Sequence, residues 1–171
     1  MDTFLSSAIK RLKYYKELGD KTFAQLSDPD FHFTPAEECN SIAVIIQHMH
    51  GNMLSRWTNF LNSDGEKEWR QRDAEFEEQN LSKQQLITLW EEGWKCFFDA
   101  LESLSTEDLE KTIYIRTETL SVPDAINRQL AHYPYHVGQI IYTGKMIKNK
   151  DWKSLSIPKG ESSAYNKKMK Q

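Results

Sequence analysis

Cysteine is scarce in this sequence: there are two, Cys39 and Cys96, and their spacing makes no CxxC motif. Two cysteines are too few for a disulfide-stabilised scaffold, so we interpret both as reduced thiols. The sequence also lacks an apolar run near the roughly 20 residues that a membrane-spanning helix needs. Its N-terminal segment lacks the basic start, the long apolar stretch and the cleavage site that are typical of a signal peptide. These absences predict a cytoplasmic protein that does not enter a membrane.

An excess of positive charge is missing as well, because 22 lysines and arginines accompany 25 aspartates and glutamates, for a formal net charge of -3. No global positive field is therefore expected to attract nucleic acid or an anionic membrane. One basic stretch begins at Lys145, where eight lysines accompany Asp151 and Glu161. Since no arginine cluster or aromatic platform joins these lysines, a solvated tail is favoured over an RNA-binding or membrane-binding arm.

What the sequence has is helical periodicity. Hydrophobic residues make up 39% of the 171 residues, enough for the core of a single domain over 1–171. They recur every three or four positions in four segments, at about 2–26, 41–61, 83–104 and 121–149. Four helices of this length joined by loops predict an all-α protein, a four-helix bundle whose core positions face one another across its axis.

Local signals refine the ends of these helices. Asn40 or Ser41 can cap the second helix, and Ser121 begins the fourth with a proline in its first turn. Before that helix, alternating apolar and polar residues in 110–121 indicate a short extended excursion, too short to build a sheet. From about residue 150 the sequence predicts an irregular tail.

The stretch QLAHYPYHVGQII places His132 and His136 four residues apart in the fourth expected helix. Side chains at i and i+4 lie one turn apart on the same face, so both rings can turn their nitrogens toward one ion. In the second helix, IIQHMHGNM offers His48 beside the apolar stripe, whereas His50 is turned about 200° away from it. His48 is therefore the candidate third ligand, and His50 is interpreted as a surface residue, like His32 in its loop.

Two interpretations of the three candidate ligands stay open. A histidine on an apolar helix is commonly a hydrogen-bonded core residue, and HxxxH without the glutamate of a zincin is a weak motif. Three buried imidazoles without an ion would, however, each need hydrogen-bond partners. One divalent metal ion is the simpler solution, and metal affinity together with availability in the cell puts zinc or nickel first.

Polar residues near these histidines are candidates for supporting the ligands. Asn52 lies one turn beyond His48, and Gln129 and Gln139 flank the HxxxH pair on roughly its side of the helix. For each of them, an ordinary polar residue at a helix edge is the alternative. A charged loop could line the entrance of the site, although a solvated loop is favoured for its residues Asp64, Glu66, Arg70, Arg72 and Asp73.

The segments NSIAVIIQH and LAHYPYHVGQI resemble the DinB/YfiT-like superfamily of four-helix-bundle proteins, and the resemblance spans nearly the whole chain. GEKEWRQRDAEF and SIPKGESSAYN are similar to a bacterial branch of it that has no assigned function. Members typically hold a divalent metal with one histidine of the second helix and an HxxxH pair of the fourth. Carried over to this sequence, the resemblance implies His48, His132 and His136 as ligands.

The resemblance also implies which reactions the site could catalyse. Some members are thiol-dependent transferases or isomerases that use a low-molecular-weight thiol, and a hydrolase role is proposed for others. Three neutral imidazoles leave positions open on an ion, which is typical of catalytic sites, where water or a thiol becomes a nucleophile. We therefore expect a metal-dependent enzyme acting on a small molecule, with thiol S-transfer ahead of hydrolysis. A metal-binding stress or interaction protein without turnover is the alternative.

Aromatic residues are numerous, with five tryptophans, seven tyrosines and eight phenylalanines. Adjacent pairs, such as Tyr14 with Tyr15 and Phe97 with Phe98, cannot both point into one core. The leftover rings would form exposed patches, which usually mark interfaces, and members of the superfamily are often dimers. We expect a two-fold homodimer formed by outer faces of the bundle, with a monomer as the alternative.

Overall fold

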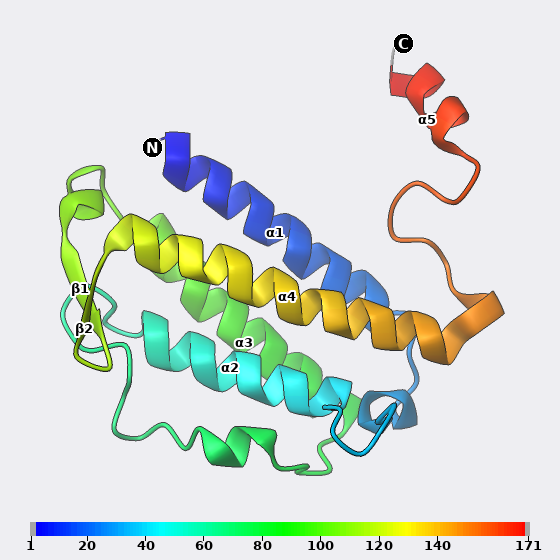
Figure 1. Ribbon diagram of the computed structural model, residues 1–171, viewed down its shortest axis with the longest axis horizontal. Coiled ribbons are helices and arrows are strands. Elements are labelled where there is room, and N and C mark those ends of the chain that lie inside the picture. Colours follow the sequence, from blue (N-terminus) through cyan, green and yellow to red (C-terminus); the bar gives the residue numbers. More distant parts are fainter. Residues whose placement is uncertain (1–2, 170–171) are drawn as a thin grey trace.

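Four long helices form the body of the computed structural model, which describes residues 3–169 (Figure 1). They are α1 (Thr3–Phe23), α2 (Ile42–Trp57), α3 (Lys83–Glu102) and α4 (Val122–Lys148). α1 packs against α4 and α2 packs against α3, while α2 also contacts α4. The all-α helical bundle predicted from the sequence is confirmed. α1 and α2 each end three or four residues earlier than expected.

Serine side chains begin three of these helices. Ser41 Oγ accepts a hydrogen bond from the backbone N–H three residues later (3.1 Å), and Ser121 Oγ does the same at the start of α4 (3.2 Å). Ser82 forms a capping box with Gln85 at the start of α3. Each cap satisfies an N–H group that the first helical turn leaves without a partner. Ser41, the second of the two candidate caps, thus sets the first residue of α2.

Aromatic side chains of α3 and α4 fill the centre of the bundle. Trp90, Trp94 and Phe97 of α3 are each at most 2% exposed, and Tyr133 of α4 meets Phe97 edge-on with ring centroids 5.2 Å apart. Buried side chains of this size remove the most apolar area from water and contribute strongly to stability. Phe98, expected as a leftover ring, instead stacks on Trp94 at 5.3 Å and packs against the core.

A two-stranded antiparallel hairpin precedes α4, formed by β1 (Thr112–Ile115) and β2 (Glu118–Ser121). The prediction that this segment is too short to build a sheet is therefore wrong. Arg116 and Thr117 make the two-residue turn with φ of 55° and 65°, the positive values that a type I′ hairpin turn requires at both positions. Apolar residues of both strands belong to the hydrophobic core, so the hairpin covers part of the bundle.

Shorter elements occupy the connections and the C-terminal segment. The expected irregular tail contains α5 (Ser162–Met169), which has no buried residue and lies away from the bundle in Figure 1. No helix within residues 3–169 combines the length and apolarity needed to cross a bilayer. Single turns of 3-10 helix occur at Pro29–His32, Asp73–Phe76, Glu107–Glu110 and Asn149–Asp151.

Candidate metal centre

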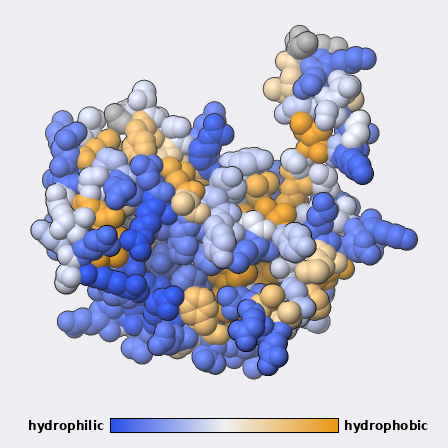
Figure 2. All heavy atoms as spheres, in the orientation of Figure 1, coloured by the Kyte–Doolittle hydropathy of each residue, from blue (hydrophilic) through white to orange (hydrophobic). Residues whose placement is uncertain are grey.

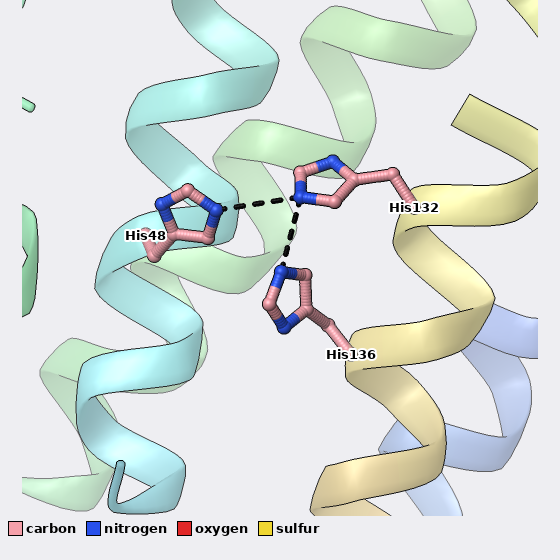
Figure 3. A group of neighbouring side chains, drawn as sticks. All are labelled: His48, His132 and His136. Atoms are coloured by element: carbon pink, nitrogen blue, oxygen red, sulfur yellow. Dashed lines mark hydrogen bonds between the residues drawn. The ribbon is translucent and has the colours of Figure 1, made fainter. Parts of the chain in front are cut away.

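Three histidines from α2 and α4 turn their rings toward one another (Figure 3). Nε2 of His132 lies 3.4 Å from Nε2 of His48 and 3.0 Å from Nε2 of His136. Two nitrogens bound at 2.0–2.1 Å to one tetrahedral zinc ion lie roughly 3.3 Å apart, so these spacings fit a shared ion. His48 and His136 are buried, and His132 is partly buried. The structure thus brings together the three histidines that the sequence singled out.

Glu75 holds the ring of His48. Its Oε2 lies 3.0 Å from Nδ1 of His48, and Arg70 donates two hydrogen bonds to the same carboxylate, at 2.7 and 2.8 Å. Burial alone would raise the pKa of Glu75, but the hydrogen bonds from Arg70 and His48 outweigh it and hold the pKa below its ordinary value. An ionised carboxylate can only accept, so Nδ1 of His48 carries a proton, and Nε2 faces the other two histidines.

Gln139 holds the ring of His136 in the same way. Nδ1 of His136 lies 2.8 Å from Oε1 of Gln139, whose Nε2 donates to the hydroxyl of Tyr135 at 3.1 Å. Because an amide oxygen only accepts, His136 also carries its proton on Nδ1, and its Nε2 lone pair faces the other histidines. Gln139 is therefore the predicted supporting residue that the structure places in contact with a candidate ligand.

The other two predicted supports, Asn52 and Gln129, line a cavity beside the histidines. Asn52 Oδ1 accepts a hydrogen bond from the hydroxyl of Tyr133 at 3.1 Å, and that hydroxyl accepts one from Trp57 Nε1 at 3.1 Å. The amide oxygen of Gln129 is buried and has no hydrogen-bond partner among residues 3–169. Both residues thus belong to the cavity rather than to the support of a histidine.

Both histidines of α4 are neutral at pH 7. Burial lowers the pKa of His132 to about 3, with repulsion from His136 and His48 acting in the same direction. Burial also lowers the pKa of His136 to about 4, although the hydrogen bond to Gln139 opposes this shift. The neutral imidazole is the form that binds a metal ion, so the pair needs no deprotonation at neutral pH.

A comparison with protein families gives one match, over residues 1–161, to the family described as Protein of unknown function (DUF1572). The chain belongs to this family. A search of curated proteins gave no match, and neither did a search of solved structures. The family's description states no activity, so the geometry of the candidate site is what indicates the function of this DUF1572 protein.

The two remaining histidines of this DUF1572 chain lie outside the converging group. His50 is partly buried, its Nε2 lies 3.4 Å from Oε2 of Glu92 on α3, and burial lowers its pKa. It is therefore not the plain surface residue that the sequence predicted. Nδ1 of His32 lies 3.1 Å from Oε1 of Glu78. Neither ring reaches the nitrogens of the candidate site.

The charged loop before α3 is built into the fold more firmly than the solvated-loop interpretation allowed. The side chain of Arg70 is 2% exposed and bonds to Glu75. Asp64 accepts backbone hydrogen bonds from Arg116 (2.9 Å) and Thr117 (2.8 Å), which ties the loop to the hairpin turn. The solvated-loop interpretation is thus wrong for Asp64 and Arg70. It holds for the side chain of Asp73, which is fully exposed, and that of Arg72 is about half exposed.

Glu75 is the residue at the site that sequence reasoning missed. It lies 27 positions after His48, in a single 3-10 turn, so no helical period connects the two. One local signal was present: Gly51, one turn after His48, has no side chain, and a Cβ there would overlap the carboxylate of Glu75. A glycine in the middle of α2, where it disfavours the helix, marks such a close approach.

Proposed function

We propose that this DUF1572 protein is DinB-like and holds one divalent metal ion through Nε2 of His48, His132 and His136. The observation that carries the proposal is the hydrogen bonding on the far side of two rings. Glu75 and Gln139 accept the Nδ1 protons of His48 and His136, which directs the Nε2 lone pairs toward His132. Structural partners of this kind normally fix the tautomer of metal-binding histidines.

Catalysis is favoured over a purely structural role for the ion. No fourth histidine, cysteine or carboxylate joins the group within the described part of the chain, whereas structural zinc sites usually have four protein ligands. A cavity of about 230 Å³ lies against His48 and His132 and gives a small molecule a place beside them. When bound, a divalent ion supplies Lewis acidity, which makes a nucleophile of water or a thiol near neutral pH.

Within this proposal, thiol S-transfer comes ahead of hydrolysis, as the resemblance to thiol-dependent members implies. The protein's own thiols do not offer the nucleophile. Cys39 and Cys96 are both outside the histidine group, and burial raises the pKa of Cys96. A thiol reacting at this site would therefore come from a small molecule in solution.

Metal content tests the first part of the proposal. Protein purified without chelator should carry about one divalent ion per chain, with zinc or nickel predominant, as measured by inductively coupled plasma mass spectrometry. His136→Ala should lose most of the metal, because it removes one of three ligands. His50→Ala is the matched control from α2 and should retain it. Equal metal content in the three proteins would overturn the assignment.

A cobalt-substituted protein tests which nucleophile the site takes. We expect a thiolate-to-cobalt charge-transfer band when cysteine, glutathione or bacillithiol is added, since this band requires sulfur in the coordination sphere of the ion. The band should be absent from cobalt-treated His136→Ala. If none of the three thiols changes the spectrum of the wild-type protein, thiol transfer is wrong, and hydrolysis or a role without turnover takes its place.

A further inference from the structure

The cavity beside the histidines is lined by positive charge. It is bordered by His48, His132, Asn52 and Gln129, and no carboxylate borders it within residues 3–169. Figure 2 shows hydrophilic surface over the left part of the region where α2 and α4 lie, beside hydrophobic patches further right. Five arginines from α2, the charged loop, the hairpin turn and α4 complete its lining: Arg56, Arg70, Arg72, Arg116 and Arg128.

Three of these arginines share two carboxylates as their ion-pair partners. Oε2 of Glu66 lies 2.8 Å from Nη1 of Arg56, 3.0 Å from Nε of Arg116 and 3.6 Å from Nη1 of Arg70. The second carboxylate, Glu75, bonds to Arg70 and also accepts the proton of a histidine. Three guanidinium groups thus share two carboxylates at ion-pair distance, and Asp64 is a further carboxylate near Arg56.

The other two arginines are only loosely paired. Nη1 of Arg72 lies 3.7 Å from Asp73, and Nη1 of Arg128 lies 3.9 Å from Glu118. Both guanidinium groups are about half exposed, and both partner carboxylates are more exposed still, so these pairs contribute little. Arg72 and Arg128 are therefore available to an anion that enters the cavity.

Gln129 adds a hydrogen-bond acceptor to the cavity, and Asn52 adds hydrogen-bond donors. Gln129 is 2% exposed, and its buried Oε1 has no partner in the described part of the chain, so it can accept a hydrogen bond from a donor in the cavity. An unpaired buried acceptor costs free energy and calls for an explanation. The oxygen of Asn52 is occupied by Tyr133, which leaves its amide N–H groups as donors.

We propose that this cavity binds a small molecule that carries an oxyanion, a carboxylate or a phosphate, together with a hydroxyl or amino group that donates to Gln129. Guanidinium groups match the paired oxygens of carboxylates and phosphates. The volume of about 230 Å³ lies below the roughly 300–1,000 Å³ of pockets for drug-sized ligands, which limits the molecule to a small one. The inference rests on the proposed function, because it names the class of substrate held beside the histidines.

Binding of simple anions to metal-free protein tests this inference without any activity. Chelator-treated protein is titrated by calorimetry at low ionic strength with inorganic phosphate and, separately, with lactate. We expect saturable binding of at least one, and whichever binds identifies the source of the oxyanion. Arg72→Gln and Arg128→Gln should each weaken it by about tenfold or more, since a hydrogen bond to a charged group is lost. Arg11→Gln, an exposed change on α1 outside the cavity, should not.

The hydrogen-bond donor has its own test. Lactate should bind more tightly than acetate, which lacks the hydroxyl group, and Gln129→Leu should remove that difference. If phosphate and lactate both fail to bind, or if Arg128→Gln binds as the wild type does, the inference is wrong. His136 does not line the cavity, so His136→Ala should lose the metal and keep the anion. Metal binding without anion binding overturns the inference alone, and anion binding without metal binding overturns the proposed function alone.

Discussion

Oε2 of Glu75 lies 3.0 Å from Nδ1 of His48, and both side chains are buried. The same carboxylate accepts two hydrogen bonds from Arg70, which lines the arginine-rich cavity. Glu75 therefore connects the histidine group with the cavity. A change in its charge or position should alter both the metal affinity and the arrangement of the arginines.

Glu75→Gln should weaken metal binding by about ten- to a hundredfold, the usual cost of losing a carboxylate partner of a metal-bound histidine. It should also lower the free energy of unfolding by about 3 kcal/mol, because Arg70 stays buried without its main counterion. Competition with a zinc-binding dye measures the first effect and urea denaturation the second. The exposed Glu77→Gln on the same loop is the control. Wild-type metal affinity in a folded Glu75→Gln protein would contradict the role of Glu75.

Gly51→Ala tests the position of Glu75 without removing its charge. A Cβ at Gly51 would overlap the Glu75 carboxylate, whereas a Cβ at Gly138 on α4 would meet nothing within 4 Å. Alanine favours a helix over glycine by about 1 kcal/mol, so Gly138→Ala should raise stability by up to that amount and leave metal affinity unchanged. Gly51→Ala should instead lower both quantities. A Gly51→Ala protein that behaves like Gly138→Ala would show that Glu75 needs no such space.

The stability of metal-free protein should depend on pH through the histidines of α4. Their pKa values fall from the ordinary 6.5 of histidine to about 3 for His132 and about 4 for His136. Between about pH 4 and 6.5 the unfolded chain thus binds more protons than the folded one, and the free energy of unfolding rises with pH. This stability is lost as the pH falls through that window.

His132→Gln should reduce the slope of the unfolding free energy against pH, because up to about one proton fewer per chain is taken up on unfolding. The measurement is urea denaturation of chelator-treated protein at about pH 5 and about pH 6.5, a window that lies above the ordinary pKa of carboxylates. His32→Gln, a change at a partly exposed histidine outside the group, is the control. An equal slope in wild type and His132→Gln would mean that His132 is not neutral and buried in solution.

The helices and the three histidines follow from local sequence patterns. Helical periodicity predicts α1 to α4 to within a few residues, and the i, i+4 spacing of His132 and His136 predicts that their rings meet. His48 could be placed because only one of the two candidate histidines of α2 borders the apolar stripe. Each of these inferences needs only the geometry of a single helix.

The surroundings of the histidines could not be predicted in this way. Glu75 meets His48 across 27 residues, and Arg116 meets Glu66 across 50, through a loop and a hairpin that have no period. The hairpin turn was missed because Arg116 and Thr117 are unusual residues for positive φ, which Asn and Gly favour. Asp64, which holds that turn, looks like a solvated charge in the sequence. Ion pairs and hydrogen bonds between residues far apart in the sequence thus position the surroundings of the histidines, and local sequence patterns do not predict these contacts.

An exposed stripe of two tyrosines and a methionine on α4 supports the expected homodimer. Tyr135, Tyr142 and Met146 are 60%, 71% and 43% exposed. Their spacing of seven and four residues places them on one face of the helix. Tyr14, one of the rings expected to be left over, is also 47% exposed, although Phe98 is not part of such a patch. Patches of exposed aromatic residues commonly form interfaces between proteins.

We therefore expect two chains to pair through this stripe, and light scattering after size exclusion at micromolar concentration measures the mass. The wild-type protein should have about twice the 20.1 kDa mass of one chain. Tyr142→Glu places a charge in the centre of the stripe and should give a monomer, because a buried unpaired carboxylate opposes association. Tyr114→Glu, at a 51% exposed position on the hairpin, should remain a dimer. A wild-type mass near 20.1 kDa would make the stripe ordinary surface and the dimer wrong.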